Sequence, residues 1–136
     1  MMQRWPGQGE YQNSLEWQKY ESFSRLLSET MTQMSVAPER EWILEVLRES
    51  ESKMARSIED GQDSVHLAEY ILSLDTVRSF LVIVDYCMRF LVDLDLVDSE
   101  LAARLEAGRA DFEALLTSRT QTLRETLRNE WHFTNN

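Results

Sequence analysis

Apolar residues recur along this chain at steps of three and four, the spacing of one face of an α-helix. One such row runs from Trp17 to Met34 and another from Trp42 to Ile58. A row from Leu101 to Leu127 alternates steps of four and three, as a coiled-coil seam does. Four glycines and two prolines in 136 residues are too few for hairpin-linked strands. The pattern therefore predicts an all-α helical bundle of about four to six helices.

The ends of the chain differ from its middle. The glycine- and proline-containing segment 1–12 is expected to be a flexible N-terminal arm. Asn13 and Glu16 have the spacing of a capping box, which predicts that the first helix starts after Asn13. We expect a single helical-bundle domain over residues 13–132, followed by a frayed tail, residues 133–136.

Helix-starting and helix-stopping residues divide the rest of the chain. Pro38 suits the first turn of the second helix because that turn does not use its N–H. Gly61 is expected to end this helix as a left-handed C-cap. A third helix is expected from Asp63 or Ser64. Asp98, or the serine after it, is expected to cap a long C-terminal helix.

The most apolar stretch of the chain is "SFLVIVDYCMRFLVDLDLVD". Asp85 and Arg89 lie within it, and each would cost a few kcal/mol in lipid, so a membrane span is disfavoured. With Arg78 and Asp93 they form one narrow polar seam on a helix. The pattern predicts a helix near residues 76–97 that is apolar on most sides. Such a helix is central in a bundle or is covered by a second copy, which would make a homodimer.

The chain is strongly acidic, with 24 acidic residues, 14 basic residues and a net charge of −10. An acidic surface repels nucleic-acid phosphates and anionic lipids. We therefore expect no direct nucleic-acid binding and no membrane association. The partner that this charge favours is a protein with a basic surface.

Motifs that carry chemistry are missing from the sequence. We find no phosphate-binding glycine loop, no nucleophile elbow and no zinc spacing, and predict no catalytic, cofactor-binding or metal-binding residue. Cys87 is the only cysteine and lies in an apolar run, which favours a core residue in a reducing cytoplasm. The enzyme alternative is a metal-dependent carboxylate site built from Asp60, Asp63, Glu69 or Asp95.

These observations favour a non-catalytic regulatory or adaptor protein that binds another protein, such as an inhibitor, an immunity-type protein, a chaperone or a regulatory subunit. A second hypothesis is a nucleic-acid mimic, in which helix-spaced glutamates stand in for phosphates and block a DNA- or RNA-binding protein. Aromatic residues near the chain ends and exposed acids are the expected contacts. The predicted partner-binding residues are Trp5, Glu41, Glu45, Glu49, Asp60, Asp63, Asp93, Asp95 and Trp131.

Overall fold

Four α-helices and two short 3₁₀ turns make up the part of the chain that the structure, a computed structural model, describes, residues 9–135. In chain order they are η1 (Tyr11–Asn13), α1 (Leu15–Gln33), η2 (Pro38–Arg40), α2 (Glu41–Gln62), α3 (Leu67–Asp93) and α4 (Ser99–Asn135). Residues 9–135 contain no strand, so the all-α prediction is confirmed.

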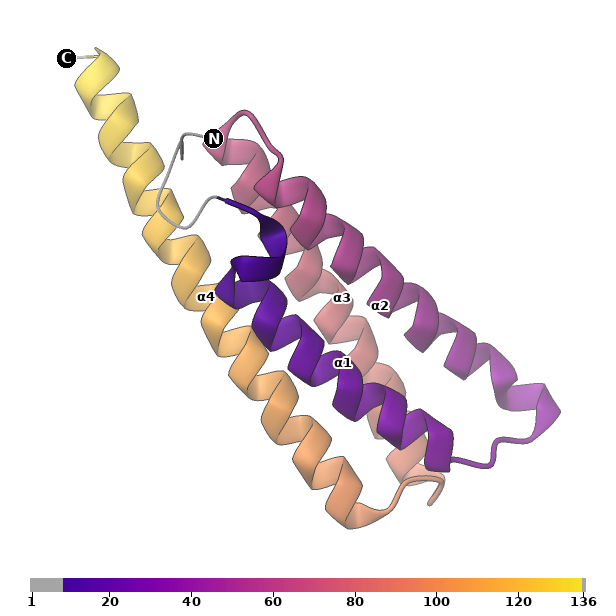
Figure 1. The fold of residues 1–136 in the computed structure, drawn as a ribbon. Helices are drawn as coiled ribbons and strands as arrows, with labels where there is room; N and C mark the ends of the chain where they lie inside the picture. Colours follow the sequence, from indigo (N-terminus) through magenta and orange to yellow (C-terminus); the bar gives the residue numbers. More distant parts are fainter. Residues whose placement is uncertain (1–8, 136) are drawn as a thin grey trace.

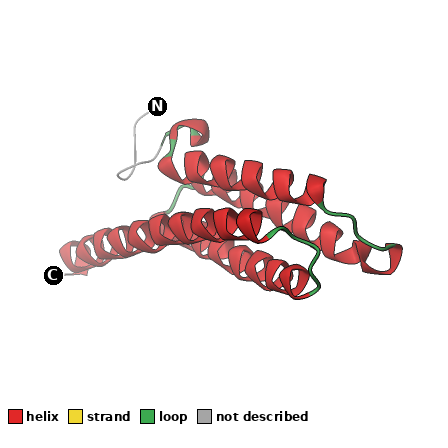
Figure 2. Cartoon of the chain, turned by 90° about the horizontal axis from the view of Figure 1, so that it is seen from below, coloured by secondary structure: helices red, strands yellow, loops and turns green. Residues whose placement is uncertain are grey.

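The helices run up and down around a closed ring (Figures 1 and 2). α1 packs against α2 and α4, and α3 packs against the same two helices from the other side. Short connections make neighbours antiparallel, as in other up-down bundles. α4 is the longest helix and extends beyond the other three at its C-terminal end (Figure 1).

α3 is the most apolar helix, but it lies at a corner of the ring instead of at its centre. The helix spans Leu67–Asp93, so it begins and ends earlier than the expected 76–97. A ring of four helices has no central position, so each helix keeps one face outside. The outer face of α3 is therefore exposed although much of it is apolar.

The hydrophobic core follows most of the predicted rows. Residues from all four helices form one cluster, which includes Phe23, Leu47, Leu74 and Phe112. The exceptions lie at row edges and helix ends. Trp42, expected on the buried side of α2, is 56% exposed because it stands in the first turn of the helix, on its outer side.

Two predicted helix ends are wrong by a few residues. Ser14, not Asn13, caps α1, and its Oγ accepts a hydrogen bond from the Trp17 N–H at 3.1 Å. The Asn13 N–H donates to Glu10 O, and the Glu16 carboxylate accepts from Arg119 Nε, so the predicted capping box does not form. The third helix begins at Leu67, after a short connection that starts at Asp63.

Gly61 does not end α2 as a left-handed cap, because α2 continues through Gln62. Its function is close packing. A Cβ at this position would lie 3.0 Å from Ser73 Cβ and 3.0 Å from Tyr70 Cδ2. Gly61 thus lets α2 approach α3 at a distance that a larger residue prevents.

The structure describes residues 9–12 of the expected arm and residues 133–135 of the expected tail. The Gly9 N–H donates to Gln62 Oε1 at 3.0 Å, and the rings of Tyr11 and Trp17 meet edge to face. This part of the expected flexible arm is therefore docked on the bundle. At the other end α4 remains helical through Asn135, within the expected tail. Residues 1–8, with Trp5, and residue 136 lie outside the described part.

No helix among residues 9–135 combines the length and the hydropathy that crossing a membrane requires. This finding agrees with the expectation drawn from Asp85 and Arg89. The two side chains pair with each other, with 3.1 Å between Arg89 Nε and Asp85 Oδ2.

Candidate functional site

A contiguous group of large apolar side chains lies on the outer face of α3. Val82, Ile83, Tyr86 and Phe90 are between 39% and 77% exposed. At 100° per residue they occupy a sector of about 100° and extend over about 12 Å of helix. We call these four residues the apolar strip. Folded monomers rarely leave such a group in water, so the strip is a candidate binding surface.

Trp42 extends this surface from α3 onto α2. Lys53 Nζ lies 5.7 Å from the centroid of the Phe80 ring, which fixes the register of the two antiparallel helices. Trp42 lies about three turns before Lys53 on α2. Because the helices are antiparallel, it lies at the level of the residue about three turns after Phe80 on α3, which is near Phe90. The exposed Trp42 indole thus lies beside one end of the apolar strip.

A cleft of about 550 Å³ opens beside the strip, between α3 and α4. Apolar side chains from three helices form its floor, among them Phe23, Val84, Met88 and Leu105. Its volume lies within the range of small-ligand pockets and is large enough for a bulky side chain of a partner. Three carboxylates and two guanidinium groups line its rim: Asp85, Arg89, Asp93, Glu106 and Arg109.

Arg109 is the centre of this charged rim. Its guanidinium contacts Glu106 at 2.6 Å, Glu113 at 2.5 Å and Asp85 at 3.5 Å. These contacts raise the pKa of Arg109, with the Glu106 hydrogen bond as the largest cause, and they lower the pKa of Glu106. Glu106 and Arg109 therefore form a charged pair at neutral pH. The side chain of Arg109 is 16% exposed.

One end of the bundle is acidic. The N-terminus of α2 and the C-terminus of α3 lie at the same end of the bundle (Figure 1). The exposed Glu41 and Glu45 are therefore at the same end as Asp93 and Asp95. The apolar strip and Trp42 approach this end. Four of the predicted partner-binding residues are thereby assembled beside an apolar surface that the sequence analysis did not identify.

Asp95 has an unusual backbone at this acidic end. Its φ of 57° makes it the only non-glycine residue with a positive φ among residues 9–135. The Asp95 N–H donates to Val92 O and the Leu96 N–H donates to Leu91 O, the two hydrogen bonds of a Schellman motif. Glycine is the usual residue at this position. An aspartate here is tolerated at some cost in stability.

The other predicted contacts lie elsewhere. Asp60 and Asp63 lie at the opposite end of α2, and Asp63 follows its last residue. Glu49 is exposed but pairs with Lys53 at 2.9 Å. Trp131, 62% exposed, lies on the extension of α4. The eight predicted residues within the described part therefore do not form one surface.

The carboxylates of the enzyme alternative are also separated. Asp95 lies beyond the C-terminal end of α3, and Asp60 and Asp63 lie near its start. The 27 residues of α3 span about 40 Å. No group of three or more His, Cys, Asp or Glu side chains in the described part is arranged to hold a metal ion. Cys87 is buried, and burial raises the pKa of its thiol, which disfavours the reactive thiolate.

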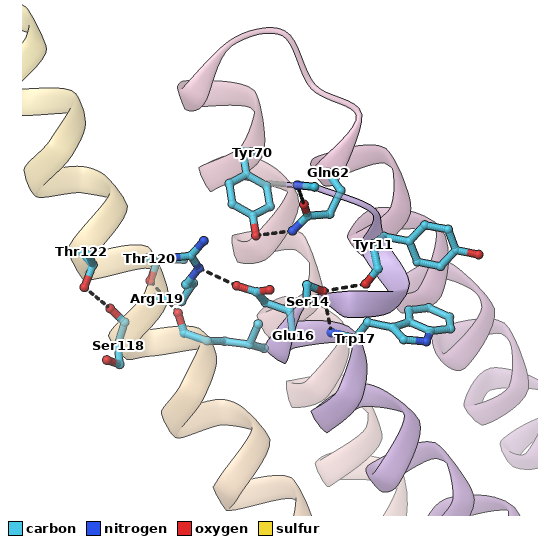
Figure 3. Close-up of polar contacts among 12 residues, drawn as sticks. Tyr11, Ser14, Glu16, Trp17, Gln62, Tyr70, Ser118, Arg119, Thr120 and Thr122 are labelled. Atoms are coloured by element: carbon cyan, nitrogen blue, oxygen red, sulfur yellow. Dashed lines mark hydrogen bonds and ion pairs between the residues drawn. The ribbon is translucent and has the colours of Figure 1, made fainter. Parts of the chain in front are cut away.

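A buried polar network joins all four helices at the other end of the bundle, and the sequence analysis missed it (Figure 3). Arg119 Nε donates to Glu16 Oε1 at 2.6 Å, and the Glu16 side chain is 2% exposed. The Arg119 guanidinium lies over the ring of Tyr70, and Gln62 Nε2 donates to the Tyr70 hydroxyl at 2.7 Å. Burial raises the pKa of Tyr70. By spacing, Arg119 falls within the row from Leu101 to Leu127, but it was also expected on the exposed face of the last helix; its side chain is 17% exposed.

Comparisons with protein-family models, with curated proteins and with solved structures found no match for this chain.

Proposed function

We propose that this protein is a non-catalytic regulatory or adaptor module that binds a basic amphipathic helix of a partner protein on the apolar strip. The observation that carries the proposal is the exposure of Val82, Ile83, Tyr86 and Phe90 on one face of α3. Complete burial of one such side chain contributes about 1.5–3 kcal/mol. Covering the strip therefore offers a substantial driving force for association.

The shape of the strip favours a helix as its occupant. A length of about 12 Å matches two to three turns of a partner helix, whose i, i+3 or i+4, and i+7 side chains would contact it. The neighbouring cleft, with Phe23 and Met88 in its floor, has room for an anchoring side chain. Large anchors in such pockets carry much of the binding energy in helix-in-groove complexes.

The charge around the strip favours a basic partner. Glu41, Glu45, Asp93 and Asp95 lie at one end of the strip, and the whole chain carries a net charge of −10. Lysines or arginines that follow the apolar anchors of the partner helix would meet these acids. A second copy of this chain would bring the same negative charge to the interface, so we place the homodimer second.

The proposal is tested by two matched double variants. Val82→Glu with Tyr86→Glu charges the strip, and Val65→Glu with Leu15→Glu charges two equally exposed apolar positions outside it. Tagged wild-type and variant proteins are compared by affinity capture from native lysate, followed by affinity measurement with the main captured protein. We expect the strip variant to lose at least about 30-fold in affinity and the control to keep it.

Equal affinity of the strip variant and the wild type would show that the strip is not the binding surface. Sedimentation of the purified proteins tests the other occupant. A wild-type dimer that becomes a monomer in the strip variant would mean that a second copy covers the strip, and would overturn the hetero-partner proposal.

The nucleic-acid mimic stays a weaker second candidate. Glu41, Glu45 and Glu49 are all exposed along α2, at steps of about 6 Å. The ion pair between Glu49 and Lys53 reduces the negative charge of this row. Reversing the three glutamates to lysine should weaken binding under both hypotheses, because Glu41 and Glu45 also belong to the acidic end of the strip. The strip variant separates the two hypotheses. Binding that is lost in the glutamate variant and kept in the strip variant would favour the mimic.

The location that fits this function is the cytoplasm, where Cys87, buried and free, would stay reduced.

A further inference from the structure

A second groove between α3 and α4 has the opposite character to the acidic end. Three arginines line it, Arg78 from α3 with Arg124 and Arg128 from α4. The groove has a volume of about 420 Å³, and its other lining residues are all polar: Thr117, Thr120, Gln121 and Glu125. The groove lies closer to the N-terminus of α3 than the cleft at Asp85 does, and the groove and the cleft share no lining residue.

The arginines of this groove have more donor groups than acceptors. The Asp75 carboxylate pairs with two of them: it lies 2.6 Å from Arg124 Nη2 and, at the longer distance of 3.4 Å, from Arg78 Nη1. Arg78 Nε is buried and has no hydrogen-bond partner. A guanidinium carries five N–H donors, and a buried donor that has no acceptor destabilises the fold. The Arg78 guanidinium thus has one long contact with Asp75 and a buried Nε–H without an acceptor.

The groove also carries surplus positive charge. Arg128 makes no ion pair with any other described residue. Three guanidinium groups face two carboxylates, Asp75 and Glu125, in a chain whose net charge is −10. An anion with several acceptor oxygens would supply the missing charge and would accept hydrogen bonds from the exposed guanidinium groups of Arg124 and Arg128.

We propose that this groove binds a phosphate monoester group. A dianionic phosphate offers three or more acceptor oxygens and is the anion that converging guanidinium forks recognise best. The Thr117 hydroxyl and the Gln121 amide supply neutral polar groups at the same groove. The volume leaves room for the organic part of the ligand. This site is independent of the apolar strip, so either proposal can fail without the other.

The test is a titration of the full-length protein with inorganic phosphate, followed by two-dimensional NMR of the arginine Nε–H groups. Sodium chloride keeps the ionic strength constant. We expect saturable shifts for Arg78, Arg124 and Arg128, with a dissociation constant on the order of 1 mM, and no shift for Arg56 on α2. The Arg128→Gln variant should bind at least about fivefold more weakly, while Arg56→Gln, an exposed control, should bind as the wild type does.

The same titration with phenyl phosphate distinguishes a free phosphate from a phosphate ester. Tighter binding of the ester indicates an organic ligand, and equal binding indicates phosphate itself; both support the site. No saturable shift up to about 20 mM phosphate, well above the expected dissociation constant, would overturn the proposal. Saturable shifts that are the same in Arg128→Gln and in wild type would also overturn it. Arg128 is exposed at the groove, so its loss should leave the fold intact.

Discussion

Removing the Arg119 guanidinium should strongly destabilise the bundle. In Arg119→Met the buried Glu16 carboxylate, 2% exposed, loses its partner at 2.6 Å. Breaking a buried ion pair by removing one partner costs about 3–5 kcal/mol, because the remaining charge stays desolvated. A domain of this size has a total stability of about 5–15 kcal/mol, so the variant should lose about a fifth or more of it. The midpoint of thermal unfolding should fall by roughly 10 °C or more.

Urea unfolding followed by far-UV circular dichroism measures this loss. The control is Arg104→Met, which removes the exposed partner of Glu29 at 3.6 Å. Exposed pairs contribute about 0–1 kcal/mol, so the control should unfold nearly as the wild type does. The double variant Glu16→Leu with Arg119→Met removes both charges and should recover most of the loss.

A loss below about 1 kcal/mol in Arg119→Met, similar to the control, would refute this reasoning. It would mean that the Glu16 carboxylate finds water or another partner when Arg119 is absent. Failure of the double variant to recover would show that Arg119 acts through its packing on Tyr70 and not through its charge.

Three further outcomes follow from local geometry, each measured by urea unfolding. Gly61→Ala should cost about 1–3 kcal/mol because its Cβ would lie 3.0 Å from Ser73 Cβ, next to the α3 backbone. Gly108→Ala should be nearly neutral because its Cβ would meet the end of the flexible Leu26 side chain at 3.0 Å and Phe23 Cδ2 at an ordinary 3.8 Å; equal costs would contradict the packing argument. Ser14→Ala should cost about 1 kcal/mol and Asn13→Ala much less, and the reverse order would restore the capping box. Burial raises the pKa of the Glu51 carboxyl, although the hydrogen bond from Ser24 acts in the opposite direction. The stability that wild type gains from protonated Glu51 is therefore fully present below about pH 4.5 and is lost as the pH rises through the raised pKa. Glu51→Gln should therefore gain stability relative to wild type between pH 4.5 and 7, and a gap that does not change with pH would contradict this.

The sequence by itself determined the fold class and most of the core. Helical spacing of apolar residues is a local property, and residues such as Leu47 and Phe112 are buried where their rows predict. The i, i+4 pair of Asp85 and Arg89 was predictable for the same reason, since both residues lie on one helix. The placement of glutamates and aspartates at helix ends was likewise readable without coordinates.

Only the tertiary structure decided what each helix face meets. The apolar character of α3 suggested a central helix, but a ring of four leaves its outer face uncovered, and this created the apolar strip. The residue type of Gly61 predicted a helix C-cap, whereas its neighbours on α3 show that it allows close helix packing. The pairing of Glu16 with Arg119 joins residues 103 positions apart, and no periodicity within one helix carries such information. Local pattern sets the secondary structure, whereas burial and pairing depend on which helices become neighbours.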